Sequence, residues 1–169
     1  MKLFNVLTVF FLSIVTTTVF AGKSGKAIES AFPTAEVKST LNETSPKARE
    51  QKFNDYFAAK LPFKISPNET LMSVKLQEDD ITFKLAFKPK YLSRFNEDDL
   101  GDLFGYENNE LNYYYCKLIS GTKAMNPKMR YSTYIYETRK GTIEQASEST
   151  FNPSVDCAYY MDPANGFVK

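Results

Sequence analysis

The first block of hydrophobic positions in the chain is uninterrupted. Residues 3–20 carry no charged side chain, and they follow the single basic residue Lys2. The block ends at Val19-Phe20-Ala21, with small side chains one and three residues before Gly22. A positive start, an apolar centre and a small-x-small end are typical of a secretory signal peptide. We therefore expect residues 1–21 to be cleaved. The alternative is an uncleaved anchor, because the length of the block is near the lower limit for spanning a bilayer, about 17 residues.

The next pattern places an apolar residue at every fourth position, which predicts a helix. Ser45-Pro46 is a typical helix start, with a capping side chain followed by proline at the first helical position. Pro62 ends the helix. Residues 22–44 contain few large apolar side chains, so we expect a flexible lead-in there. The predicted buried face of the helix consists of Phe53, Phe57 and Leu61.

Alternation of apolar and polar residues then predicts a β-hairpin. Thr70 to Gln77 forms one strand and Ile81 to Phe87 the other, separated by the polar turn Glu78-Asp79-Asp80. A hairpin of this kind has one apolar side and one side that faces solvent. The apolar side is expected to carry Met72, Val74, Leu76, Ile81, Phe83, Leu85 and Phe87.

The second half of the chain repeats the order of helix and hairpin. Asn109 to Ser120 predicts a helix, with Gly121 as its stop. Lys128 to Thr138 predicts the longest strand, followed by the turn Arg139-Lys140-Gly141. Thr142 to Phe151 pairs back, and its few apolar residues favour an edge strand. The predicted buried face of the helix consists of Leu111, Tyr115, Leu118 and Ile119.

An acidic stretch precedes this helix and allows two interpretations. From Asn96 to Glu107 the spacing of oxygen-bearing side chains partly matches an EF-hand calcium loop, but Leu100 occupies a ligand position. The alternative, which we favour, is an acidic helix start with Asn96 as the cap. No metal site is therefore expected.

The two cysteines, Cys116 and Cys157, predict one disulfide, because paired cysteines in an exported chain usually bond. The chain-entropy model assigns roughly 4 kcal/mol to closing a loop of about 40 residues. A redox pair is the alternative. The chain has neither a C-x-x-C spacing nor a histidine to activate a thiolate, so we favour the structural disulfide.

The absence of histidine also excludes much enzyme chemistry. It removes Ser-His-Asp and Cys-His catalysis and the usual zinc sites. There is no glycine-rich phosphate loop and no dinucleotide fingerprint, so no cofactor is expected. The chain also lacks tryptophan, which a glycosidase usually offers. We favour a protein that is not an enzyme, with a carboxylate-based hydrolase as the alternative.

Charge restricts the partners. Removal of residues 1–21, with Lys2, leaves 20 basic and 20 acidic residues and a formal charge of zero. A neutral chain has no long-range attraction to nucleic acid or to anionic membranes. We expect a secreted or periplasmic protein with a protein partner, which meets the membrane only through its signal segment. Its oligomeric state stays open, as does glycosylation at the sequons of Asn42 and Asn68.

Tyrosine supplies the candidate binding surface. The chain has 11 tyrosines, grouped at 113–115, 131–136 and 159–160. Exposed tyrosines are enriched at interfaces, because they offer a large contact area at low entropic cost. Cross-strand packing is the alternative reason for aromatic residues on a strand. The candidate binding residues are Arg130, Tyr134 and Tyr136.

The order of elements resembles small exported bacterial proteins of unknown function. The resemblance rests on Tyr115-Cys116, the strand Tyr131–Tyr136, Gly141 and Cys157, and covers roughly residues 45–157. It implies an α+β fold with a disulfide from a helix to the carboxyl end, and it carries no active site. The order also looks like cystatin-type folds, although the inhibitory glutamine-valine-glycine loop of cystatins is not visible.

Together these patterns predict one α+β domain at residues 45–160 and a tail at 161–169. An antiparallel sheet of about four strands, built from two hairpins, is expected to be covered by two helices. The leading hypothesis is an exported, non-enzymatic binding or assembly protein of the cell envelope or exterior. Besides the hydrolase, a secreted inhibitor or effector that acts on a host protein stays open.

Overall fold

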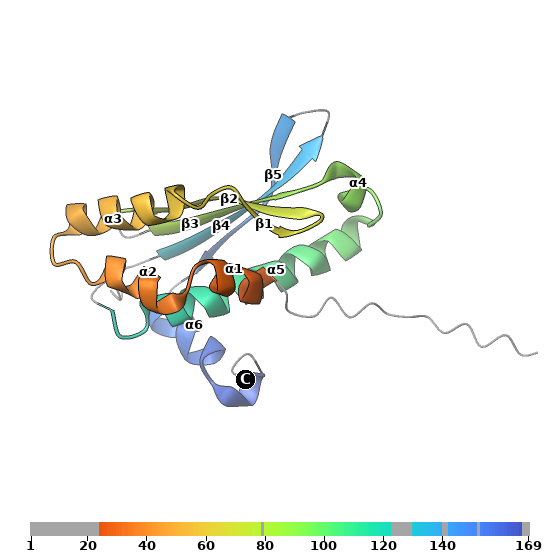
Figure 1. Cartoon of the computed structure of the whole chain (residues 1–169). Helices are drawn as coiled ribbons and strands as arrows, with labels where there is room; N and C mark the ends of the chain where they lie inside the picture. Colours follow the sequence, from red (N-terminus) through yellow and green to blue (C-terminus); the bar gives the residue numbers. More distant parts are fainter. Residues whose placement is uncertain (1–23, 79, 123–129, 140–141, 152, 167–169) are drawn as a thin grey trace, which may run out of the picture.

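The fold is α+β, as predicted, with one five-stranded sheet (Figure 1). The structure, a computed structural model, describes residues 24–78, 80–122, 130–139, 142–151 and 153–166. The strands follow one another across the sheet in chain order. They are β1 (Phe63–Ser66), β2 (Glu69–Gln77), β3 (Asp80–Phe87), β4 (Arg130–Arg139) and β5 (Thr142–Phe151).

Helices α1, α2 and α5 gather on one side of the sheet, and α6 lies against α5 (Figure 1). Helix α3 contacts β2 and α2. Among the described residues, no helix combines the length and the hydropathy needed to cross a bilayer. The helices are α1 (Ser24–Ala31), α2 (Thr34–Leu41), α3 (Pro46–Ala58), α4 (Pro89–Leu92), α5 (Glu97–Ile119), α6 (Pro153–Tyr160) and the 3₁₀ turn η1 (Pro163–Asn165).

Both predicted hairpins are present, but the way they join was not predicted. β2 pairs antiparallel with β3, and β4 pairs antiparallel with β5. β3 and β4 run parallel, in register from Asp80 opposite Arg130 to Phe87 opposite Glu137. A parallel pair needs a long crossover connection, which α4 and α5 supply. The sheet is therefore mixed, with β1 as an added strand, and the cystatin-like order is not confirmed.

The apolar side of β2 changes phase within the strand. Leu71, Val74 and Leu76 are buried, whereas Met72 is 39% exposed. The register with β3 shifts between Leu71 and Ser73, which adds one residue to β2 at this point. A shift of one residue turns the following side chains to the other face. The prediction that Met72 belongs to the buried side was therefore wrong.

The segment expected to be a flexible lead-in contains two helices instead. The segment buries four large apolar side chains in two pairs, each spaced four residues apart: one pair on α1 and directly after it, the other on α2. The segment has few large apolar residues, but each of these four lies on the side that packs against the rest of the domain. The four fully buried residues are Ile28, Phe32, Val37 and Leu41.

Both predicted helix caps are present, but α3 ends at Ala58, so Leu61, expected on its buried face, lies beyond the helix. Ser45 caps α3, with its side chain accepting a hydrogen bond from the Ala48 N–H at 3.5 Å. Asn96 caps α5, with Oδ1 accepting from the Asp99 N–H at 2.8 Å. The stretch that partly matched a calcium loop is thus the acidic start of a helix. α5 begins at Glu97, twelve residues before the predicted start, and Gly121 beyond its end has a positive φ of 71°.

Candidate interaction surface

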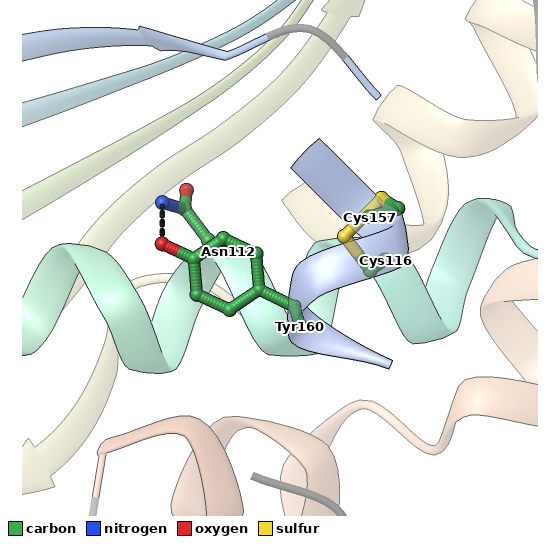
Figure 2. The surroundings of a disulfide bond; sticks show 4 residues. All are labelled: Asn112, Cys116, Cys157 and Tyr160. Atoms are coloured by element: carbon green, nitrogen blue, oxygen red, sulfur yellow. Dashed lines mark hydrogen bonds between the residues drawn. A yellow bond between two sulfur atoms is a disulfide. The ribbon is translucent and has the colours of Figure 1, made fainter. Parts of the chain in front are cut away.

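A disulfide joins helix α6 to helix α5. Cys116 of α5 and Cys157 of α6 are bonded, as predicted, with their Cα atoms 5.4 Å apart (Figure 2). Cys116 is fully buried and Cys157 is 6% exposed. The bond therefore lies inside the contact between the helices.

Hydrogen bonds from one tyrosine reinforce this contact. The Tyr160 hydroxyl of α6 donates to Asn109 Oδ1 at 2.7 Å. The same hydroxyl accepts from Asn112 Nδ2 at 3.1 Å, as Figure 2 shows. Residues 157 and 160 lie three apart on α6, so both anchors are on one helix face. The orientation of α6 about its own axis is thus fixed.

The opposite face of α6 presents apolar side chains to solvent. Val155 is 66% exposed and Tyr159 is 56% exposed, and they lie four residues apart. Ala158 is exposed beside them, and Met161, just after the helix, is 38% exposed. We name these four residues the α6 patch. Three of the four large hydrophobic side chains found exposed in the described residues belong to this patch, so the apolar exposure is concentrated there.

The chain segment that carries the α6 patch is acidic. Between Pro153 and Gly166 the charged residues are Asp156 and Asp162. Asp156 is half-buried and Asp162 is exposed, where it caps η1 by accepting from the Ala164 N–H at 2.9 Å. The patch therefore combines an apolar centre with negative charge at its edge, which favours a partner with the reverse charge.

Two of the three consecutive tyrosines of α5 belong to the core instead. Tyr114 is 1% exposed and Tyr115 is fully buried, and only Tyr113 is half-buried. Burial raises the pKa of both buried phenols far above the ordinary value. The Tyr114 hydroxyl donates to the Phe32 carbonyl at 2.8 Å, which ties α5 to α1 and α2. For these two residues, packing explains the aromatic side chains.

The predicted binding residues lie on β4. Arg130, Tyr134 and Tyr136 pair with Asp80, Lys84 and Ala86 of β3. Lys84 and Ala86 are half-buried and alternate with the core residues Phe83 and Leu85. Contacts of the β4 side chains fall outside what the structure describes, so this binding surface stays a prediction.

Glu36, Tyr56 and Lys60 form a hydrogen-bonded cluster at the surface. Tyr56 donates to Glu36 Oε2 at 2.8 Å, and Lys60 Nζ donates to the Tyr56 hydroxyl at 2.9 Å. The Tyr56 hydrogen bond and Lys60 together lower the pKa of Glu36, and the Tyr56 hydrogen bond raises the pKa of Lys60. This arrangement links α2 to α3. Within the described part of the chain, no three His, Cys, Asp or Glu side chains are grouped so that they could hold a metal ion.

Sequence reasoning missed the α6 patch. It assigned no helix to the segment around Cys157. Pro153 is a typical first helical residue, and Cys157 and Tyr160 then share one face while Val155 and Tyr159 share another. That two-sided pattern is the signal that identifies the patch.

In comparisons with known proteins, no family model and no curated protein matches this chain. A protein from Pseudomonas aeruginosa described as secreted is 11% identical, with a TM-score of 0.44, over 73% of this chain and 95% of that chain. A pilotin of the Vibrio vulnificus type 2 secretion system is 12% identical, with a TM-score of 0.39, over 71% and 94% of the two chains. At these TM-scores neither similarity bears on function.

Proposed function

We propose that this chain is an exported, non-enzymatic binding or assembly protein of the cell envelope or exterior. Its contact surface for a protein partner is the α6 patch. The observation that carries the proposal is the exposure of Val155 and Tyr159 on a helix that a disulfide and Tyr160 hold in place. Export is supported by the apolar block at residues 3–20 and by the disulfide itself.

The energetics of the patch favour association. Burying an apolar or aromatic side chain of this size contributes about 1.5–3 kcal/mol. Because Cys157 and Tyr160 already fix α6, a partner does not have to order the helix, and less entropy is lost on binding. Tyrosine is also one of the residue types that dominate binding energy at interfaces.

The charge next to the patch indicates which charge the partner surface should carry. Asp162 is an exposed acid next to the patch, and residues 153–166 include no basic residue. The expected partner surface has an apolar depression for Tyr159 and lysine or arginine side chains around it. Contacts between exposed charges weaken with ionic strength. Salt should therefore slow association more than it speeds dissociation.

The test places a photo-reactive amino acid at Tyr159 and, as a control, at the exposed Ser93, in protein exported by its own host. We expect a discrete cross-linked species from position 159 and none from position 93. The double variant Val155→Ser/Tyr159→Ser should lose the partner in co-purification while its melting temperature stays within a few degrees, because both side chains are exposed. Equal cross-linking from both positions, or full recovery of the partner with the double variant, would exclude the α6 patch.

The β4 surface is proposed as a second contact region of the same protein. Its support is the tyrosine content of β4 and the pairing of Tyr134 and Tyr136 with the half-buried Lys84 and Ala86. The variant Tyr134→Ala/Tyr136→Ala, with and without Arg130→Ala, should lower recovery of the partner. Unchanged recovery removes this surface and leaves the α6 patch unaffected, so the two regions are tested separately.

A further inference from the structure

A groove of about 510 Å³ runs between α3 and the edge of β2, and none of its lining residues belongs to the α6 patch. One wall is the side of α3, and the other is the second half of β2. The residues where α3 leads into β1 close one end. The lining residues that matter here are Glu50, Asn54, Asp55, Leu61, Met72 and Val74.

The groove exists because β1 is short. β1 pairs with β2 only at residues 69–71, so the edge of β2 from Ser73 to Gln77 has no neighbouring strand on that side among the described residues. α3 covers part of this edge through Asn54. Its Nδ2 donates to the Leu76 carbonyl at 2.9 Å, and its Oδ1 accepts from the Leu76 N–H at 2.8 Å. One side-chain amide thus takes the place that a peptide group of another strand would fill.

Val74 offers the same hydrogen-bonding pattern in the groove. In an antiparallel pair, backbone groups two residues apart point to the same side of the strand. Leu76 turns its N–H and C=O toward α3, so those of Val74 also point away from β3 and toward the groove. The register with β3 supports this orientation of Val74. Gln77 lies opposite Asp80 next to the turn, and Lys75 lies opposite Thr82 two residues further along, so the backbone groups of Gln77 and Lys75 are the ones that point toward β3. The backbone N–H and C=O of Val74 therefore face the groove, in the arrangement that a neighbouring strand would pair with.

We propose that the α3–β2 groove binds an extended peptide segment of a partner protein by strand addition at Val74. The segment carries a basic side chain toward α3. Glu50 and Asp55 supply two negative charges on the α3 wall, against the single positive charge of Lys75 on β2. Met72, 39% exposed at the same edge, offers an apolar contact for the next side chain of the peptide. Main-chain bonds give such a site its affinity, and alternate side chains give it specificity.

The groove is short, which restricts the ligand. At one end of the groove Asn54 already accepts the hydrogen bond of the Leu76 N–H. Leu61 and Pro62 line the other end. The peptide therefore pairs over only a few residues, so binding in the micromolar to millimolar range is expected from few contacts. This proposal involves different residues from the α6 patch, and each can fail while the other holds.

The test uses a terminally blocked peptide of alternating valine and lysine, titrated into the mature protein and followed by amide NMR. We expect saturable shifts centred on the Val74 amide and slower hydrogen exchange at that amide. The same peptide with N-methylated backbone amides should bind at least tenfold more weakly, because it cannot form the strand hydrogen bonds. Binding that leaves the Val74 amide unshifted, equal binding of the methylated peptide, or no binding at millimolar peptide would each overturn the proposal.

Charge is tested with a matched pair of variants. Asp55 and Asp102 are both exposed acids on helices, but only Asp55 lines the groove. Asp55→Lys should weaken binding of the valine–lysine peptide about five- to tenfold, and Asp102→Lys should leave it unchanged. An equal loss in both variants would mean that the peptide responds to net charge alone, which contradicts a built site.

Discussion

Gly25 shows how one missing side chain sets the distance between two helices. A Cβ at this buried position of α1 would lie 3.0 Å from the backbone oxygen of Glu110 and 2.8 Å from its Oε2. Both distances are shorter than ordinary contacts. Gly101, within α5, has nothing within 4 Å of the same added atom. The two glycines therefore serve different roles although both lie in helices.

We predict opposite effects for alanine at these two positions. Gly25→Ala forces α1 away from α5 and should lower the free energy of unfolding by about 1–2 kcal/mol. Gly101→Ala should raise it by about 0.5–1 kcal/mol, because alanine loses less backbone entropy in a helix. Urea denaturation of both variants gives the comparison. A Gly25→Ala protein as stable as the Gly101→Ala protein would contradict the close approach.

The buried Tyr114 predicts alkaline sensitivity. Burial raises its pKa in the folded protein, so the unfolded chain loses the phenolic proton first as the pH rises above about 10. Stability is fully present below that pH and falls above it. Each such group contributes a slope of about 1.4 kcal/mol per pH unit.

The measurement is urea denaturation of Tyr114→Phe and of the parent protein between about pH 8 and pH 11. At neutral pH the variant should lose about 1 kcal/mol, because the Phe32 carbonyl loses its donor. Above about pH 10 that difference should shrink, since the variant no longer carries this titrating phenol. Tyr159→Phe, at a position 56% exposed, is the control and should cost little stability at neutral pH. A constant difference across the pH range would argue against the raised pKa.

At the scale of elements, α6 depends on its links to α5. It has eight residues, and helices shorter than about 12–15 residues are marginal in water on their own. The disulfide closes a sequence separation of 41 residues and joins α6 to the longest helix. The presentation of the α6 patch therefore depends on that covalent link.

We predict that Cys116→Ser/Cys157→Ser loosens α6 before the sheet. The overall loss of stability should be about 2–4 kcal/mol, and hydrogen exchange should accelerate most in α6 and least in β2 and β3. Tyr160→Phe removes the two hydrogen bonds but keeps the disulfide. This variant should lose about 1 kcal/mol of stability, and hydrogen exchange in α6 should accelerate less than in the double serine variant. Unchanged α6 protection in the double serine variant would show that packing alone holds the helix.

For the whole molecule, the prediction concerns export. We expect cleavage between Ala21 and Gly22, ahead of helix α1, which begins at Ser24. Intact mass spectrometry of the exported protein should show a chain that lacks residues 1–21 and is two hydrogens lighter than the reduced form. Alkylation should require a reductant. A full-length mass with two reactive thiols would instead indicate an anchored protein, and the proposed location would be wrong.

The sequence by itself determined the parts that local chemistry controls. The caps at Ser45 and Asn96, the stop at Gly121 and the alternation in β3 each act within a few residues. The edge position of β5 also followed from its composition. The disulfide between Cys116 and Cys157 followed from compartment and count, because there were only two cysteines to pair. These signals sufficed for the α+β class and for both hairpins.

Only the tertiary structure decided which surfaces meet. The parallel pairing of β3 with β4 depends on a long crossover, and the burial of Tyr114 depends on α1, which is distant in the chain. The exposure of Met72 depends on one extra residue in β2, and that of Val155 and Tyr159 on which face of α6 the disulfide turns inward. The period of a sequence shows that a helix or strand has two sides. Which side is covered depends on contacts between residues far apart in the chain, and the candidate binding surfaces follow from those contacts.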